Sequence, residues 1–314
     1  MVIGFVVSLV KYSLIIPHFD DSERLERLLR TVPTDRRDLA VIVVDDCSPD
    51  QAGLLELKEE WPTVLWLSTS RNSGAGAARN VGLDNATGKW LVFADSDDEF
   101  LPNAFENFDS VLRDDDQLVF FLAQAVQERD GLPSTRADRI NALVHEYATR
   151  PSDRTLRELQ LGHVNPVAKI YRRSFIESHS LRFDSVQVSN DVGFNVMASV
   201  KAINLRVEPI PVYRIYRRSG SLTSTVSSET FLKRFEVSLS LAERLHGFGV
   251  NNAVSATGSM VRALSYGPRI TWYVWRKAIS SPMLVDWSRV LNLSRWVAYF
   301  TRNRQVREER RKNS

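Results

Sequence analysis

Acidic residues follow three short apolar runs in the first hundred residues of the sequence. The runs are YSLIIP, LAVIVV and WLVFA, and the acidic residues come at or just after their carboxyl ends. Carboxylate oxygens are ligands that Mg²⁺ and Mn²⁺ prefer, and these ions commonly bind one or two carboxylates together with substrate phosphates. The residues concerned are Asp20, Asp21, Asp45, Asp46, Asp95, Asp97 and Asp98.

The triplet Asp95-Ser96-Asp97 has a spacing that suits a metal. Two carboxylates that are two positions apart at a strand end can both reach one site if the chain turns there. Asp-rich strand ends are also common turn and helix-cap material, and the triplet alone does not separate the two interpretations. The presence of the other acidic pairs favours a cation site, for which Asp97 and Asp95 are the predicted ligands.

Asp45 and Asp46 precede Cys47-Ser48 and a helical pattern. A carboxylate at this place can accept hydrogen bonds from a nucleotide base or a ribose hydroxyl. Asp and Ser are also strong helix N-cap residues. The nucleotide contact and the helix cap both stay open, since one aspartate could make the contact while the other forms the cap.

The segment NSGAGAARN, residues 72–80, is a glycine-rich loop that opens a helix. It resembles a dinucleotide-binding fingerprint only superficially, because Arg79 stands where the third glycine or alanine belongs. It also follows the third predicted strand instead of the first. A small-residue helix that begins at the site suits close packing and anion binding, and Arg79 is expected to support a nucleotide or a carboxylate.

Strands and helices alternate through the first 95 residues. Apolar runs bounded by turn residues predict strands, and apolar residues at helical spacing predict the helices between them. The predicted strands are 12–16, 39–44, 64–68 and 90–94, and the predicted helices are 22–31, 54–61 and 75–86. This order predicts an α/β fold with a doubly wound, mostly parallel sheet. Ligands bind beyond the carboxyl ends of such strands, so the three acidic clusters should converge on one edge.

The pattern is less regular after Pro102. Further strands are predicted at 118–126, 168–171 and 206–216, and helices at 191–200 and 231–245, whereas 131–154 is predicted as loop with some helix. Tyr213–Arg218 (YRIYRR) with Ser219-Gly220-Ser221 suits closure over a diphosphate, and a solvated basic loop is the alternative. The five histidines have no metal-ligand spacing, although His163 is a candidate for approaching an acceptor or a metal.

The net charge of +3 conceals an asymmetry between the two ends of the chain. Residues 265–314 carry 11 Lys and Arg against 3 Asp and Glu, a net of +8, which leaves −5 for the other 264 residues. Trp and Tyr are interspersed with arginines in this region, a composition that suits an anionic lipid surface. An ordinary helical subdomain with a basic tail is the alternative. Nucleic acid is not the expected partner, because its binding favours a basic patch on the folded domain.

Other composition features restrict the class of protein. No apolar stretch reaches the roughly 18–20 residues that span a bilayer, and residues 1–11 lack the basic region and cleavage site of a signal peptide. Cys47 is the only cysteine, which excludes an internal disulfide and fits a reducing compartment. The expected location is the cytoplasm, with a peripheral position on the cytoplasmic face of the membrane as an extension.

Taken in order, these segments resemble glycosyltransferase family 2, the inverting enzymes with a GT-A fold. The resemblance covers about residues 12–225. It departs from the family pattern at His18-Phe19-Asp20, at Cys47 and at Asn190, which precedes Asp191 where the family has Glu-Asp. The matching segments are SLIIPHFDD (13–21), VIVVDDCSPD (41–50), RNSGAGAARNVGLDNATGKWLVFADSDDEF (71–100), VAKIYRRSFI (167–176), SNDVGF (189–194) and YRRSGSLT (216–223).

The resemblance implies a role for each matching position. Asp191 would be the catalytic base, although by its pattern alone it is a helix N-cap. Asp97 would be the direct ligand of Mn²⁺ or Mg²⁺, and Asp95 would lie near the ribose and the metal. The remaining nucleotide-sugar residues would be Pro17, Phe19, Asp21, Asp46, Arg79 and Ser96, and the diphosphate or acceptor loop would involve Lys169, Asn190, Arg217, Arg218 and Ser221.

The predicted function is the transfer of a sugar from a nucleoside-diphosphate donor, UDP-linked by expectation. The acceptor would be a hydroxyl of a saccharide or lipid-linked saccharide, in polysaccharide or glycoconjugate biosynthesis. The alternatives are a nucleotidyltransferase and an inactive family member that binds glycans or a partner. The predicted divisions are an extra segment (1–11), a GT-A domain (12–225), a helical region (226–301) and a basic tail (302–314).

Overall fold

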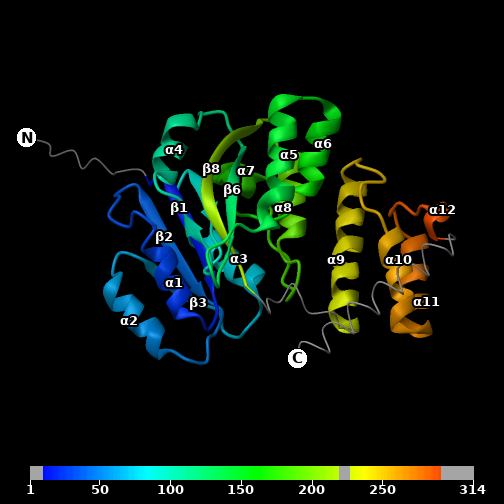
Figure 1. Ribbon diagram of the computed structural model, residues 1–314, viewed down its shortest axis with the longest axis horizontal. Coiled ribbons are helices and arrows are strands. Elements are labelled where there is room, and N and C mark those ends of the chain that lie inside the picture. Colours follow the sequence, from blue (N-terminus) through cyan, green and yellow to red (C-terminus); the bar gives the residue numbers. More distant parts are fainter. Residues whose placement is uncertain (1–9, 219–226, 291–314) are drawn as a thin grey trace, which may run out of the picture. The chain divides into compact units, whose positions relative to one another are not determined.

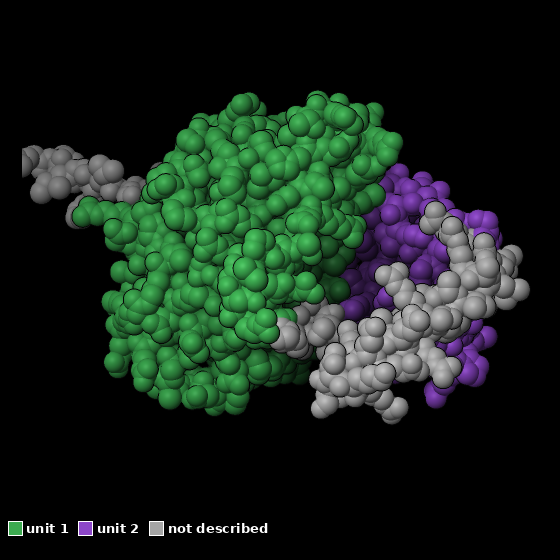
Figure 2. Space-filling model, viewed as in Figure 1, with its two compact units in different colours: residues 1–224 green, residues 225–314 purple. Residues whose placement is uncertain are grey.

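The computed structural model describes residues 10–218 and 227–290 of the chain. The chain divides into two compact units, residues 1–224 and residues 225–314, which Figure 2 shows in green and purple. Figure 1 labels the elements of both units. The predictions for residues 1–9, Ser221 and the basic tail lie outside the described residues.

In its described part, unit 1 contains an eight-stranded sheet with the strand order β3-β2-β1-β4-β7-β6-β8-β5. Strands β3, β2, β1 and β4 are parallel neighbours, β7 is antiparallel to both β4 and β6, and β5 is antiparallel to β8. The predicted α/β fold with a mostly parallel sheet is confirmed. The strands are β1 (Tyr12–His18), β2 (Leu39–Asp45), β3 (Leu65–Ser68), β4 (Trp90–Phe93), β5 (Glu99–Phe100), β6 (Leu118–Gln127), β7 (Lys169–Arg172) and β8 (Leu205–Arg217).

Helices connect these strands and cover the sheet (Figure 1). Each of the first three helices follows a strand and returns the chain to the start of the next, which keeps β1 to β4 parallel. The helices of unit 1 are α1 (Ser22–Leu29), α2 (Ala52–Glu60), α3 (Ala75–Asn85), α4 (Ala104–Val111), α5 (Asp138–Thr149), α6 (Asp153–Gly162), α7 (Arg173–Ser178) and α8 (Val192–Lys201).

The central strand β1 is buried along its whole length, because helices pack on both faces of the sheet. Successive side chains of a strand point to opposite faces. Tyr12, Leu14 and Ile16 belong to the main core cluster, together with Leu25 and Leu28 of α1. Each buried leucine contributes roughly 1.5–3 kcal/mol of apolar burial, so the helical spacing of the α1 leucines is what fixes this helix to the sheet.

Two local predictions differ from the structure. Residues 138–149, predicted as part of a mostly loop region, form the regular helix α5 with buried Ile140 and Val144. The helix is difficult to predict because its apolar face is narrow and most of its other residues are polar. Strand β1 continues through Pro17 to His18. Its pairing with β4 ends at Ile15, so the missing N–H of Pro17 costs no hydrogen bond on that side.

Helix α3 approaches β1 closely at Gly82. A Cβ atom built at this glycine would lie 2.3 Å from Cγ2 of Ile15, on the sheet face opposite to the main core cluster. Only a residue without a side chain allows this spacing of helix and strand. The small-residue composition of 75–86 therefore serves the packing of α3 against the sheet.

Unit 2 is helical in its described part. Helix α9 begins at the N-cap Ser227, whose side chain accepts a hydrogen bond from the N–H of Thr230. An apolar cluster that includes Phe235, Met260 and Val274 forms its core. The helices are α9 (Ser228–Gly247), α10 (Thr257–Ala263), α11 (Pro268–Ile279) and α12 (Trp287–Val290).

Gly82→Ala should destabilise the protein by about 1–3 kcal/mol, because an added methyl group in this packed contact displaces Ile15 or the helix. Chemical denaturation measures the change in the free energy of unfolding. Gly258→Ala in α10 is the matched control, since a Cβ there meets nothing within 4 Å, and alanine favours helix. Equal stability of the two variants would contradict the close-approach argument.

Candidate active site

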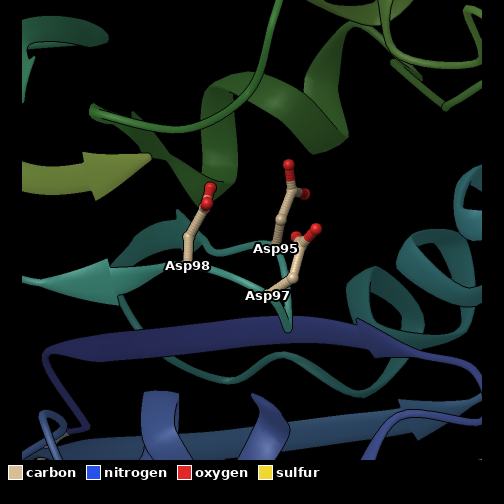
Figure 3. Close-up of side chains that lie close together, drawn as sticks. All are labelled: Asp95, Asp97 and Asp98. Carbon is tan, nitrogen blue, oxygen red and sulfur yellow. The ribbon is translucent and has the colours of Figure 1, made fainter. Parts of the chain in front are cut away.

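The loop that joins β4 to β5 carries three carboxylates at one edge of the sheet. One oxygen of each of Asp95, Asp97 and Asp98 lies within 4.8 Å of the others. All three side chains extend to the same side of the loop (Figure 3). The turn brings residues i and i+2 to one place, which the sequence analysis required for a metal site.

Different contacts hold the three carboxylates. Asp98 is buried, and its carboxylate accepts a hydrogen bond of 2.9 Å from the backbone N–H of Tyr216 in β8. Asp95 accepts a hydrogen bond from the guanidinium of Arg79, and its own backbone N–H donates to the Tyr213 hydroxyl at 2.9 Å. Within the described residues, no hydrogen bond from another residue reaches the Asp97 carboxylate.

The electrostatics of this cluster favour a bound cation. Burial, and then the charge of Asp95, raises the pKa of Asp97. Burial, and then the charges of Asp95 and Asp97, raises the pKa of Asp98 well above its usual value. Like charges held close together out of water resist full ionisation. A divalent cation offsets this repulsion, and three carboxylates are a hard oxygen donor set that fits Mg²⁺ or Mn²⁺.

Arg27 of α1 contacts the backbone of residues 94–98, the metal loop of the candidate site. Its guanidinium donates to the backbone carbonyl of Asp97 at 2.6 Å and lies 3.9 Å from the ring centre of Tyr216. It also pairs with Glu99 and Glu128. The role of Arg27 cannot be predicted from the sequence, because its only local signal is a place on the polar face of a predicted helix.

Asp46 organises the glycine-rich loop. The buried carboxylate accepts hydrogen bonds from the backbone N–H groups of Ser73 (3.1 Å) and Gly74 (2.6 Å), and from the hydroxyl of Thr69 (2.8 Å). Its neighbour Asp45 accepts from the backbone N–H of Ser48 at 3.1 Å. Both carboxylates of the pair therefore hold local backbone, and Asp46 shapes the loop that leads into α3.

Two glycines of this loop are required by its geometry. Gly74, the N-cap of α3, has φ +88°, a conformation that L side chains rarely adopt. A Cβ at Gly76 would lie 2.4 Å from the backbone oxygen of Asp184 and 2.8 Å from Cβ of Asn190. The glycines thus bring the start of α3 against the segment that precedes Asp191.

Arg79 joins the two halves of the site. It is 5% exposed, and its guanidinium donates to the carboxylate of Asp95 and, at 3.1 Å, to Oδ1 of Asn190. The guanidinium carbon lies 5.4 Å from the ring centre of Phe183. One buried cation therefore ties the metal loop to the residue before Asp191, a contact that the sequence predicted only in outline.

Asp191 stands at the N-cap position of α8, but its side chain makes no capping hydrogen bond. Burial raises its pKa; the charge of Asp95 acts in the same direction, whereas Arg79 and Lys169 lower it. A carboxylate whose pKa is raised toward neutrality is a better proton acceptor for an alcohol. The geometry is therefore that of a candidate base, not of a simple helix cap.

The other predicted nucleotide-sugar residues lie at the same carboxyl edge. Pro17 is buried in β1 and Phe19 is 45% exposed. Asp21 pairs with Arg24 and, at 3.4 Å, with Arg218, next to Arg217 at the end of β8. Ser96 lies in the metal loop between Asp95 and Asp97.

Two residues with expected roles have buried side chains. Lys169 lies in strand β7, within the strand predicted at 168–171, and is 2% exposed. His163 is fully buried at the end of α6, and burial lowers its pKa well below the usual value. Neither side chain lies on the protein surface, because α8 and the preceding loop segments pack over this part of the sheet.

Comparison with known proteins gives a consistent family. The model of "Glycosyl transferase family 2" matches residues 13–179, more than half of the chain. A succinoglycan biosynthesis protein, ExoO of Rhizobium meliloti, is 29% identical over 224 residues, which cover 62% of this chain and 60% of that protein. A cholesterol galactosyltransferase of Borreliella burgdorferi is 27% identical over 262 residues, with coverage of 76% and 68%.

Solved structures show the same fold. The structure of Staphylococcus aureus TarS in complex with UDP-GlcNAc aligns with a TM-score of 0.60 at 21% identity, covering 86% of this chain and 73% of that one. A mannosyltransferase from Pyrobaculum calidifontis, in complex with GDP-Man and Mn²⁺, aligns with a TM-score of 0.50 at 13% identity, covering 92% and 80%. The predicted GT-A fold is confirmed.

Mn²⁺ should raise the melting temperature of the wild-type protein, because a ligand that binds only the folded state stabilises it. Asp97→Asn should lose this response. In chelator at neutral pH, the same variant should melt higher than wild type. The pKa of Asp97 is higher in the folded than in the unfolded protein, so stability falls as the pH rises between these two pKa values. Above that range, the ionised Asp97 costs stability.

Thermal scanning with and without Mn²⁺ measures both effects. Asp115→Asn is the matched control, because Asp115 is exposed and lies just before β6, at the opposite edge of the sheet. The control should respond to Mn²⁺ as wild type does. An undiminished Mn²⁺ response in Asp97→Asn would contradict the ligand role of Asp97.

Proposed function

The chain belongs to glycosyl transferase family 2, and from this membership and the carboxylates at the sheet edge we propose that it is an inverting glycosyltransferase. It transfers a sugar from a nucleoside-diphosphate donor, UDP-linked, to a hydroxyl of a saccharide or lipid-linked saccharide. The reaction serves the assembly of a polysaccharide or similar glycan. The single observation that carries the proposal is the cluster of Asp95, Asp97 and Asp98 joined through Arg79 to the Asp191 segment.

Asp97 and Asp95 would hold Mn²⁺ or Mg²⁺, which when bound stabilises the negative charge of the leaving diphosphate. Asp97 is the better ligand of the two, since the Asp95 carboxylate already accepts a hydrogen bond from Arg79. Pro17, Phe19, Asp21 and Ser96 would surround the nucleotide. Asp46 would act through the loop that it shapes.

Asp191 would accept the proton of the acceptor hydroxyl. Its burial and raised pKa suit this role, and it makes no side-chain capping bond that would occupy it. With the acceptor held by Asp191 on one face of the sugar and the diphosphate leaving from the other, attack inverts the anomeric configuration. Asn190, whose oxygen already binds Arg79, would set the position of Asp191 within its loop.

The names of relatives support the donor class and the pathway. ExoO is described as a succinoglycan biosynthesis protein, and the structure of TarS contains UDP-GlcNAc. The chain matches only 60% of the length of ExoO, so the acceptor of that protein is not transferred. We propose UDP-sugars as the first donors to test.

Asp191→Asn should lower the turnover of UDP-sugar by about 10²–10⁴-fold, with little change in the KM for the donor, because the base acts in the chemical step. A screen of UDP-glucose, UDP-galactose and UDP-GlcNAc in Mn²⁺, with release of UDP as the signal, measures this. Asp97→Asn should lose turnover and its metal dependence, and Asp115→Asn should keep wild-type turnover.

The products separate the alternatives. Release of inorganic diphosphate from a nucleoside triphosphate would indicate a nucleotidyltransferase instead. Binding of a UDP-sugar without turnover by the wild type would indicate an inactive binding protein. Full transfer by Asp191→Asn would contradict the base assignment while leaving the metal site untouched.

We propose residues 12–225 as the catalytic domain and the helical region 226–301 as a lipid-facing part, with 302–314 as a basic tail. No helix within the described residues is long and apolar enough to cross a membrane. In helix α11, Trp272 is 64% exposed and Ile279 57% exposed, on a hollow of about 600 Å³ that Leu264 and Pro268 also line. Arg276 lies 5.0 Å from the Trp272 ring centre.

Aromatic and aliphatic side chains with arginine beside them suit the surface of an anionic bilayer. The double variant Trp272→Ala/Ile279→Ser should bind vesicles that contain phosphatidylglycerol about tenfold or more weakly than wild type, since it loses roughly 2–3 kcal/mol of apolar burial. Vesicle sedimentation measures binding. Ile203→Ser is the control, because Ile203 is 88% exposed in unit 1; an equal loss in that control would contradict a specific α11 face.

A further inference from the structure

A buried polar cluster lies beneath the first turns of α8, and the proposed reaction does not use it. Its members are Lys169 and Tyr171 of β7, Asn195 of α8 and the backbone carbonyl of His163. Lys169 is 2% exposed, and Tyr171 and Asn195 are fully buried. Buried lysines are rare unless paired, so this cation requires an explanation.

Every neighbour of the Lys169 amine is one that a cation prefers. The amine donates to the carbonyl oxygen of His163 at 2.7 Å and to Oδ1 of Asn195 at 3.1 Å, and it lies 4.7 Å from the ring centre of Phe120. Burial lowers the pKa of Lys169 well below its usual value, and the charge of Asp191 opposes this shift only in part. Two oxygen acceptors and an aromatic face favour the ammonium over the neutral amine.

Asn195 connects this cation to Asp191. Its Oδ1 accepts hydrogen bonds from Lys169 and, at 2.6 Å, from the Tyr171 hydroxyl. Both donors face the same atom, so the amide nitrogen must point the other way. Nδ2 of Asn195 donates to the backbone carbonyl of Asp191 at 2.8 Å. The side-chain orientation of Asn195 is therefore fixed, and with it the first turn of α8.

The charged groups around Asp191 come from three other elements. Arg79 on α3 and Lys169 on β7 favour its ionised form, and Asp95 after β4 opposes it. Arg79 is already engaged by Asp95 and Asn190. His163 is held neutral by burial and by Lys169, and burial together with the charge of Asp191 keeps Tyr171 protonated. Of the two cations, Arg79 acts more strongly on Asp191, and Lys169 adds to its effect.

We propose that Lys169 is a positioning residue for Asp191: its hydrogen bond to Oδ1 of Asn195, whose Nδ2 binds the backbone carbonyl of Asp191, fixes the turn that carries the carboxylate. The inference rests on the proposed role of Asp191 as the base. The charge of Lys169 adds to that of Arg79 in favouring the ionised carboxylate, so without it the carboxylate would take up a proton at a higher pH.

The test compares pH profiles of kcat/KM for UDP-sugar turnover. Lys169→Met removes the charge with little change in side-chain length. We expect it to lose about tenfold or more of the wild-type rate at pH 6 and to recover much of that loss at pH 8.5, with the donor KM and Mn²⁺ response unchanged. The acid limb of the profile should move to higher pH, because a cation that favours ionisation is gone.

Tyr171→Phe is the matched control. It removes the other hydrogen bond to Oδ1 of Asn195 without changing a charge, so it should lower the melting temperature and leave the acid limb in place. If Lys169→Met does not fold, Lys169→Gln, which keeps hydrogen-bond donors but no charge, should show the same shift. The proposal would be overturned if the folded Lys169 variant kept the acid limb of its kcat/KM profile at the wild-type pH. It would also be overturned if Tyr171→Phe shifted the acid limb equally.

The Asp191→Asn variant separates the two levels of inference. Loss of turnover in Asp191→Asn with an unshifted Lys169→Met profile would overturn the role of Lys169 alone. Retained turnover in Asp191→Asn would overturn the base assignment, and the role of Lys169 with it.

Discussion

The mutual repulsion of three carboxylates within 4.8 Å at the end of one strand is the constraint on which the rest of the site depends. Arg79 pairs with one of the three carboxylates, that of Asp95, and the other contacts hold this loop without adding a positive charge to the carboxylates. The Tyr216 amide binds Asp98, the Tyr213 hydroxyl accepts from the backbone of Asp95, and Arg27 binds the carbonyl of Asp97. The loop is thus fixed by its backbone and by its flanking residues, while the Asp97 side chain stays available to a cation.

Two buried cationic residues, Arg79 and Lys169, lie around these carboxylates. Arg79 contacts Asp95 on one side and Asn190 on the other, so it couples the loop of the three carboxylates to the segment of Asp191. Lys169 lies beneath the same segment and reaches it through Asn195. A buried cation is costly unless it is paired. Arg79 is paired with Asp95, and Lys169 donates to two oxygen acceptors, so each buried cation has partners.

Close approach of the α3 backbone to neighbouring segments brings the two halves of the site together. Gly76 brings the start of α3 against Asp184 and Asn190, and Gly82 brings the same helix against β1. Asp46 fixes the loop before this helix through the N–H groups of Ser73 and Gly74. The glycine-rich segment therefore works as a packing element, which explains why it resembles a dinucleotide fingerprint in composition but not in spacing.

The sequence by itself determined the α/β class, the first four strands and the family, because apolar periodicity and strand-end carboxylates are local signals. It also indicated Asp95, Asp97 and Asp191. It did not reveal helix α5, whose apolar face is narrow, nor the roles of Arg27, Asn195 and the buried Lys169. Only the tertiary structure shows the contacts of these residues, because Arg27 binds residues 70 and 101 positions away and Lys169 binds a residue 26 positions away on another element. The function of a cationic side chain depends on which acidic group folding brings beside it. The spacing of residues in the sequence does not show which groups become neighbours in space.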